Sequence, residues 1–286
     1  MINDGIDSED YHRAIDASIP SNLDNIRIIL FEPQGPLNIG ATARSVKGMG
    51  LSQLYLVNPK PFLNCRETWY MSHGAADLVR NCHIVECLDT ALKGIQFLVG
   101  TTHRRRKEKL ARPTTARDAA KEIARFSQNQ QVAVLFGRED FGLSTEHVSR
   151  CHLTASIPMA MKNPSLNLAQ AVQIFVYEIF LESLESKIEP VGLQNANIDE
   201  IERFYQRLLA LVERIGVKPR NGDWKYLMRS VRRVFSRTGL ENRDIGTLDL
   251  IFSSAHRYIN RLEEQLRSDR HEIAENPNSQ NEKLIT

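Results

Sequence analysis

The chain has 286 residues, 42% hydrophobic and 25% charged, a composition typical of a globular protein with one large domain or two smaller ones. It contains no apolar run long enough to span a membrane. Its acidic amino terminus also lacks the hydrophobic stretch of a secretory signal, so we expect a cytoplasmic protein. Four cysteines are too few for a disulfide scaffold and lack the CxxC spacing of a zinc site, so no metal is expected.

Charge is distributed unevenly along the chain. Residues 1–24 carry a net charge of −5, whereas residues 25–266 contain 33 basic and 25 acidic residues, a net charge of +8. A basic body is typical of proteins that bind a polyanion, although many enzymes have one too.

Short apolar runs alternate with helical patterns up to residue 183. The runs predict strands over 26–31, 54–57, 83–86, 97–100, 132–136 and 153–158. The patterns between them predict helices over 39–49, 75–80, 88–94, 116–126 and 167–183. Asn38 is expected to cap the first helix with its side-chain oxygen. Strands separated by helices imply a mostly parallel sheet covered on both faces, so 26–183 is expected to be an α/β domain.

The rest of the chain is expected to have a different character. Residues 1–25 are predicted to be a flexible acidic tail, and residues 184–197 a linker. Residues 198–266 show three amphipathic helical patterns, the third over 243–266, and are expected to form a small helical extension. The polar segment 267–286 is predicted to be disordered.

Familiar nucleotide-binding motifs are missing, since neither GxGxxG nor GxxxxGK[ST] occurs. A first candidate motif, NIGATAR at 38–44, lies at a strand-to-helix junction. Gly40 keeps the helix slim there, so that a ligand or a backbone segment can approach. Arg44 lies on the second helical turn, where a guanidinium can reach a phosphate. The alternative is a capped helix with a surface arginine.

A second candidate motif, FGREDFGL at 136–143, directly follows a predicted strand. Parallel sheets bind ligands at the carboxyl ends of their strands. Gly137 would let a ligand meet bare backbone, and Glu139 offers a carboxylate. The alternative is a turn with a solvated arginine–glutamate pair.

A third candidate motif spans residues 157–173, where a strand ends and a helix begins. Asn167 can cap that helix, and Ser165 precedes it by two residues. Capping alone is a sufficient explanation for both side chains. The apolar face of the helix is expected to form core or a dimer surface.

Basic residues cluster in two further places. The loop HRRRKEK at 103–109 follows a strand end, and arginines recur at 229, 233 and 237 in the second C-terminal helix, with Arg232 beside them. These side chains are suited to phosphate contacts, although a solvated helix face would look the same.

The three motifs, in this order and each after a strand, resemble those of the SPOUT-superfamily RNA 2′-O-ribose methyltransferases, the SpoU/TrmH group, over residues 26–183. The C-terminal helices resemble the extension of a bacterial tRNA-methylating branch of that group. The resemblance implies a parallel sheet with a deep C-terminal trefoil knot, a homodimer with the active site at its interface, and S-adenosylmethionine as cofactor. It also implies 2′-O-methylation of tRNA, with cytidine or uridine at anticodon-loop position 32 as the expected target.

The resemblance also assigns roles to residues. The implied catalytic residues are Asn38, Arg44, Glu139, Ser165 and Asn167. The implied cofactor-binding residues are Thr101, Thr102, His103, Gly137, Ile157, Pro164, Ser165 and Leu166. The expected RNA-binding residues are Arg104, Arg105, Arg106, Arg229, Arg232, Arg233 and Arg237. Two alternatives remain: a ribosomal RNA ribose methyltransferase, and a catalytically silent RNA-binding protein of the same fold.

Overall fold

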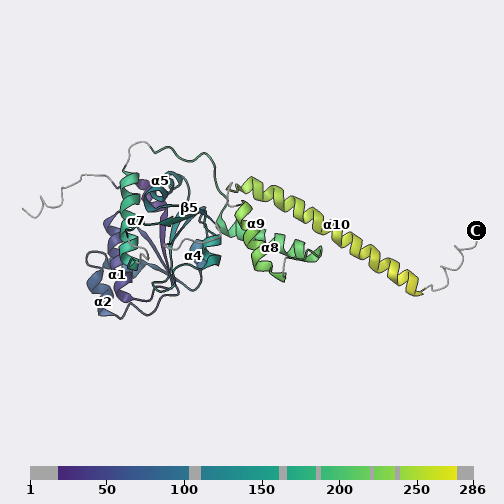
Figure 1. Cartoon of the computed structure of the whole chain (residues 1–286), viewed down its shortest axis with the longest axis horizontal. Helices are drawn as coiled ribbons and strands as arrows, with labels where there is room; N and C mark the ends of the chain where they lie inside the picture. Colours follow the sequence, from purple (N-terminus) through teal and green to yellow (C-terminus); the bar gives the residue numbers. More distant parts are fainter. Residues whose placement is uncertain are drawn as a thin grey trace, which may run out of the picture.

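A single sheet of seven parallel strands organises the chain, in the order β3-β2-β1-β6-β4-β7-β5 (Figure 1). The computed structural model describes residues 19–102, 111–160, 166–184, 188–219, 222–235 and 239–275. The strands are β1 (Ile26–Phe31), β2 (Gln53–Val57), β3 (His83–Val85), β4 (Phe97–Thr101), β5 (Arg112–Thr115), β6 (Val132–Phe136) and β7 (Leu153–Ser156). The predicted parallel α/β architecture is confirmed.

Helices cover the sheet and then continue beyond it. The short 3₁₀ helix η2 (Ser21–Asn25) precedes β1. The helices among the strands are α1 (Pro36–Gly48), α2 (Arg66–Met71), α3 (Ala76–Asn81), α4 (Leu88–Leu92), α5 (Ala116–Phe126), α6 (Thr145–Ser149) and α7 (Leu168–Ser183). The C-terminal helices are α8 (Ile198–Arg214), α9 (Trp224–Phe235) and α10 (Asn242–Glu275). The described residues from 19 to 184 are called the α/β body below.

Both faces of the sheet are buried, which explains the apolar run from Ile28 to Phe31 in β1. Ile28 and Leu30 join one core with α1, α5 and α7. Ile29 points the other way, into a second core with α4 and α6. Because neighbouring strand residues face opposite sides, a strand covered on both sides needs apolar residues at successive positions.

Four short elements of the body escaped prediction: η2, β5, α2 and α6. Residues 21–25, at the end of the predicted flexible tail, form η2 and bury Asn22 and Leu23. The strand β5 has the sequence RPTT, in which Pro113 hides any strand pattern. Proline is tolerated there because β5 lies at the edge of the sheet.

The predicted start of α1 at residue 39 is wrong. The helix begins at Pro36, with Gly35 at the N-cap position. Proline suits the first helical position because its fixed φ fits the helix and its missing N–H needs no partner there. Asn38 therefore lies in the first turn and does not cap the helix, which leaves its side chain available for other contacts.

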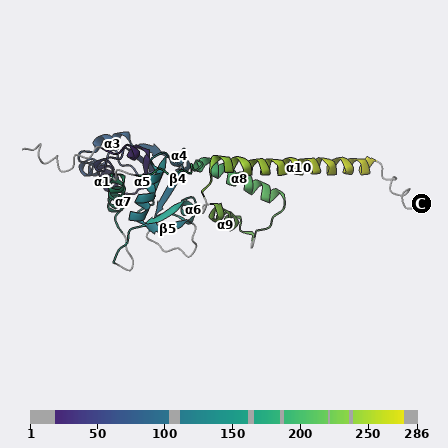
Figure 2. The same cartoon turned by 90° about the horizontal axis from the view of Figure 1, so that it is seen from above.

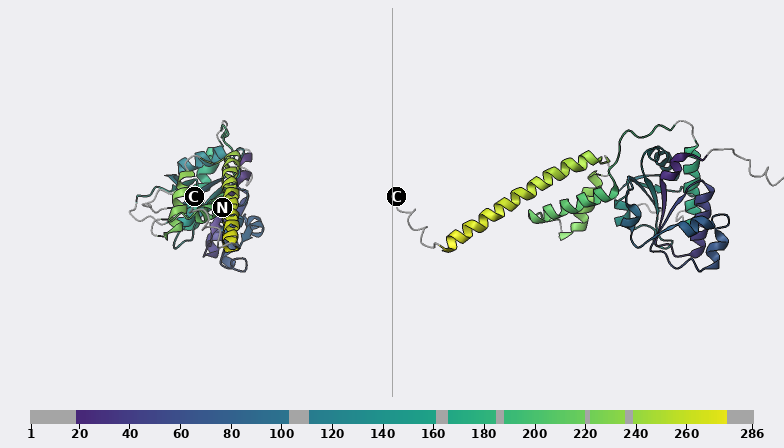
Figure 3. Two further views of the ribbon diagram at one scale, coloured as in Figure 1. Left: turned by 90° about the vertical axis from the view of Figure 1, so that its right-hand side faces the viewer. Right: turned by 180° about the vertical axis from the view of Figure 1, so that it is seen from behind.

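The C-terminal helices have a small core of their own, built around the buried side chains of Phe204, Tyr205 and Ile245. Helix α10 does not end at 266, as predicted, but continues to Glu275. Figures 2 and 3 show α10 running outward from the α/β body. Every helix within the described ranges is too short or too polar to cross a bilayer.

The end of the predicted linker is packed rather than free. The Ala196 amide donates to the Leu240 carbonyl at 2.6 Å, and the Ile198 amide donates to the Ile95 carbonyl at 2.8 Å. These bonds join the start of α8 to the residues just before α10 and to the α/β body.

Gly40 meets a neighbouring backbone and not a ligand. A Cβ added at Gly40 would lie 2.2 Å from the carbonyl oxygen of Thr68 in α2. Any side chain larger than hydrogen would therefore push α1 and α2 apart.

We expect Gly40→Ala to lower the free energy of unfolding by about 1–3 kcal/mol, the usual cost of overpacking. Gly48 is the matched control, since nothing lies within 4 Å of an added Cβ there. Gly48→Ala should keep or slightly raise stability. Urea unfolding of both variants checks this, and equal stability would contradict the close α1–α2 contact.

Candidate active site

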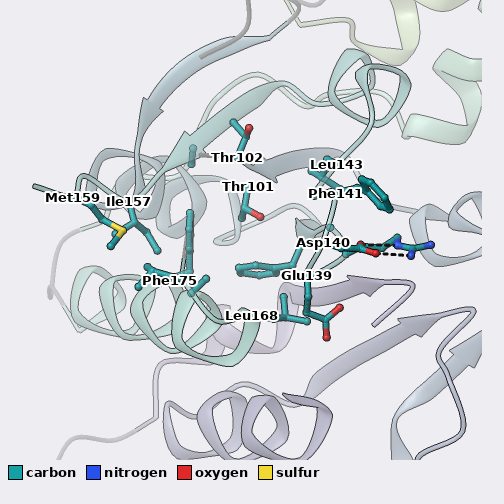
Figure 4. A pocket seen from close by; sticks show the side chains of 17 residues that line it. Thr101, Thr102, Glu139, Asp140, Phe141, Leu143, Ile157, Met159, Leu168 and Phe175 are labelled. Atoms are coloured by element: carbon teal, nitrogen blue, oxygen red, sulfur yellow. Dashed lines mark hydrogen bonds and ion pairs between the residues drawn. The ribbon is translucent and has the colours of Figure 1, made fainter. Parts of the chain in front are cut away.

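A cavity of about 230 Å³ opens at the carboxyl edge of the sheet, where β6, β4 and β7 end side by side (Figure 4). Its lining residues are Thr101, Thr102, Phe136, Gly137, Arg138, Glu139, Asp140, Phe141, Gly142, Leu143, Ala155, Ile157, Met159, Leu166, Leu168, Ala171 and Phe175. Phe136 and Phe175 are buried and meet edge to face at a centroid distance of 5.5 Å. The cavity combines these apolar groups with threonine hydroxyls and carboxylates along its wall.

The structure brings together all five of the predicted cofactor-binding residues that it describes. The lining includes Thr101, Thr102, Gly137, Ile157 and Leu166, which come from three distant segments. His103, Pro164 and Ser165 lie outside the described residues.

Glu139 ties the loop after β6 to the start of α1. Its carboxylate accepts hydrogen bonds from the Gln34 amide at 3.0 and 3.1 Å and from the Gly35 amide at 3.3 Å. It also accepts one from Asn38 Nδ2 at 2.9 Å. A negative charge is favoured at this place because the first N–H groups of a helix lack partners within the helix.

Asn167 extends this contact to α7. Its Nδ2 donates to Asn38 Oδ1 at 2.8 Å, while its Oδ1 caps α7 by accepting from the amides of Ala169 and Gln170. Three of the five predicted catalytic side chains therefore form one hydrogen-bonded row, Asn167–Asn38–Glu139. Capping and contact with Asn38 use different atoms of Asn167, so the two roles coexist.

Arg138 forms a second connection between the same two loops. Its guanidinium donates to both carboxylate oxygens of Asp140, at 2.9 and 2.8 Å, and to Glu32 at 2.9 Å. These bonds, first from Asp140 and then from Glu32, raise the pKa of Arg138. The expected arginine–glutamate pair thus exists, but its acidic partner is Glu32 rather than Glu139.

Gly137 lines the cavity and has a packing role as well. A Cβ at Gly137 would lie 2.2 Å from the carbonyl carbon of Gly142. The glycine therefore serves the tight return of its own loop, which the Gly142 amide closes by donating to the Arg138 carbonyl at 2.8 Å.

Arg44 does not join the row. It is exposed, lies outside the cavity lining and forms no hydrogen bond or ion pair with the residues that the structure describes. Arg44 is six positions after Asn38, so at about 100° per residue the two side chains leave α1 in directions about 120° apart. Within one protomer, the side chains of Arg44 and Asn38 therefore do not point into the same site.

The predicted RNA-binding arginines fall into three groups. Arg104, Arg105, Arg106 and Arg237 lie outside the described residues. Arg233 is exposed on α9, and Arg229 is half-buried there. Arg232 is engaged within the protein, because its guanidinium binds both carboxylate oxygens of Glu202 and lies 4.4 Å from the ring centroid of Tyr205.

Sequence reasoning did not assign a role to Arg138, Asp140 or Phe141, although all three stand inside the second motif. The partner of Arg138, Glu32, is 106 residues away in sequence. No local pattern could have revealed that pair. Among the described residues, no cluster of histidine, cysteine, aspartate and glutamate side chains is arranged to hold a metal ion.

Comparison with known proteins identifies the family. The sequence profile of the SpoU rRNA methylase family matches residues 25–177. The chain belongs to the SpoU methylase family. The resemblance drawn from the three motifs is thereby confirmed.

Relatives within the SpoU methylase family match far beyond the motifs. The tRNA (cytidine/uridine-2′-O-)-methyltransferase TrmJ of Sodalis glossinidius is 38% identical over 232 residues, covering 79% of this chain and 89% of its own length. TrmJ of Pectobacterium atrosepticum is 36% identical, covering 82% of this chain and 98% of its own length. The similarity therefore includes C-terminal residues beyond the methylase region.

Solved structures of the SpoU methylase family agree with this fold. TrmJ from Z. mobilis superposes with a TM-score of 0.70 at 26% identity, covering 80% of this chain and 98% of the other. A methylase family protein from Neisseria gonorrhoeae gives a TM-score of 0.60 at 33% identity, covering 68% of this chain and 99% of the other.

Two substitutions at Asn167 should separate its two roles. Asn167→Ala removes the cap of α7 and is expected to cost about 1 kcal/mol of unfolding free energy. Asn167→Asp keeps a capping oxygen but loses the Nδ2 donor to Asn38, so its stability should stay near that of the unaltered protein. Urea unfolding curves measure both, and equal losses in the two variants would contradict the capping role.

Proposed function

We propose that the protein uses S-adenosylmethionine to methylate the 2′-hydroxyl of a tRNA ribose, at cytidine or uridine 32 of the anticodon loop. The observation that carries this is the row Asn167–Asn38–Glu139, which reaches the cavity wall through Glu139. The relatives named TrmJ, matched over nearly their whole length, support tRNA as the substrate.

The cavity fits the proposed cofactor. Phe136, Phe175 and Ile157 offer an apolar surface for an adenine ring, and the threonines at the end of β4 offer polar groups for its sugar and amino acid. S-adenosylmethionine would supply a methyl group already activated by its sulfonium charge. The protein's task is then to align the hydroxyl and to help remove one proton, and alignment alone can contribute several kcal/mol.

The side chains divide this work. Glu139 accepts a hydrogen bond from Asn38 Nδ2, and this orients the Asn38 carboxamide so that its oxygen faces Asn167. Arg44 is suited to gripping a phosphate next to the target ribose, because a guanidinium offers only donors and keeps its proton in water. A phosphate oxygen or a water molecule then accepts the hydroxyl proton. Ser165 belongs to the third motif, two residues before Asn167, and would help to position the 2′-hydroxyl.

A homodimer would bring Arg44 to a site. Helices α1 and α7 pack side by side on one face of the sheet and expose Leu37, Tyr177 and Leu181, with 48%, 47% and 41% of their surface accessible. Leu37 lies at the start of α1, next to Asn38, whereas Tyr177 and Leu181 lie about 15–21 Å along α7 from Asn167. Exposed apolar side chains spread along two paired helices are suited to contact with a second copy. Arg44 on the same helix would then reach the site of the partner protomer.

The strand order supports the proposed knot. β6 lies between β1 and β4, and β7 lies between β4 and β5, so each late strand separates two earlier ones. A C-terminal segment that passes between earlier strands in this way is what a trefoil knot requires.

We expect the purified protein to transfer label from S-adenosylmethionine to unmodified tRNA transcripts, at the 2′-oxygen of position 32. Arg44→Ala should lower kcat/KM about 100-fold, the scale of losing one positioned charge contact. Arg44→Lys should recover little, because lysine cannot grip a phosphate through two bonds. Near-normal turnover of Arg44→Lys would exclude that role.

Mixing two inactive variants tests the shared site. Arg44→Ala and Asn167→Ala proteins, exchanged as subunits, should regain part of the activity, since a mixed dimer contains one site with both residues. No recovery in mixtures that do exchange subunits would contradict an active site built across the dimer.

The substrate class is tested separately. In the labelling experiment, label on ribosomal RNA but on no tRNA would favour a ribosomal RNA ribose methyltransferase.

Binding to tRNA should weaken steeply with salt, because each phosphate contact releases counterions. Replacing Arg104, Arg105 and Arg106 together by glutamine should reduce the slope of log affinity against log salt by about two to three. Arg125→Gln is the control, since Arg125 is a surface arginine of α5 next to Glu122. An unchanged slope in the triple variant would remove that loop from the RNA contacts.

A further inference from the structure

One aromatic ring at the cavity is exposed. Phe141 has 64% of its surface accessible, although it belongs to the cavity lining. The other large apolar side chains of the described lining, such as Phe136, Phe175 and Leu143, are buried or half-buried. Single exposed apolar side chains are common on protein surfaces. Of the described residues with a large exposed apolar side chain, Phe141 is the one that lines the cavity, and this position points to a binding role.

The loop holds this ring in place. The Arg138 guanidinium lies 5.3 Å from the Phe141 ring centroid. That guanidinium is itself fixed by Asp140 and Glu32, and the loop is closed between Arg138 and Gly142. A ring fixed in advance loses little conformational entropy when a partner binds, which favours recognition.

The position of the Phe141 ring indicates which kind of ligand can contact it. Figure 4 places Phe141 at the opposite end of the cavity from Ile157 and Met159, beside Leu143. The buried rings inside the cavity already provide an apolar surface for the cofactor. The exposed apolar residues of the proposed dimer surface lie on α1 and α7, not on this loop.

We propose that Phe141 is the stacking platform for an unstacked base of the RNA substrate, next to the ribose that is methylated. The inference rests on the proposed function. Proteins recognise RNA loops by stacking splayed-out bases on aromatic rings, and Phe141 offers such a ring at the rim of the cavity. Phe141 is thus a substrate-binding residue that the methylase motifs do not assign.

Three substitutions test the role of the ring. Phe141→Ala should raise KM for tRNA about tenfold, the scale of losing one stacked base. Phe141→Leu keeps an apolar side chain without a flat ring and should be as impaired as alanine. Phe141→Tyr should restore KM to near the original value. Recovery by leucine would show that only apolar packing matters and would overturn the inference.

Controls separate the ring from the fold and from the cofactor. Tyr70→Ala removes another exposed aromatic residue, 82% accessible on α2 and outside the cavity lining, and should leave KM unchanged. Melting temperature and the dissociation constant of S-adenosylmethionine should be the same for all Phe141 variants. A tenfold weaker cofactor affinity, or loss of the dimer, in Phe141→Ala would overturn the stacking role.

The outcomes also distinguish this inference from the proposed function. If the unaltered protein methylates no RNA, the proposed function fails before any variant is compared. If it methylates tRNA and Phe141→Ala has an unchanged KM, the function stands and the stacking platform is rejected.

Discussion

The carboxylate of Glu139 is the contact on which the rest of the site depends. It binds two backbone amides and one side-chain amide at the start of α1, and so draws that helix against the loop after β6. The helix carries Asn38 into reach of Asn167 and sets the direction of Arg44. Arg138 repeats the connection one residue earlier, through Glu32. Two consecutive side chains thus fix two loops that are far apart in sequence.

Such contacts require backbones that approach closely. An added Cβ at Gly137 or at Gly40 would lie 2.2 Å from a backbone atom, and one at Gly100 would lie 2.7 Å from Cys151 Sγ. Each glycine is therefore needed for packing. The loops after β6 and before α1, which border the cavity, are held by hydrogen bonds within the protein. This part of the cavity wall is consequently organised before any ligand arrives.

The sequence predicted the parallel architecture well, because apolar runs and helical periods are local. It also predicted that the three motifs follow strand ends, and parallel strands then place them at one edge. The sequence could not predict which residues form hydrogen bonds with Glu139 and Arg138. The bonds from Glu139 to Gln34 and from Arg138 to Glu32 join residues more than a hundred positions apart. Local capping rules also misplaced the start of α1, since Pro36 began the helix before Asn38 could cap it.

The C-terminal helices are joined to the body by charge as well as by packing. Glu202 of α8 binds Arg232 of α9 and lies 3.4 Å from Arg150 of the body, which also pairs with Asp89 at 2.6 Å. These arginines and Glu202 expose less than a fifth of their side chains, so removing one partner would leave a poorly solvated charge. Arg232 therefore links α9 to α8 through Glu202. The docked helices thereby hold Arg229 and Arg233 of α9 beside the α/β body.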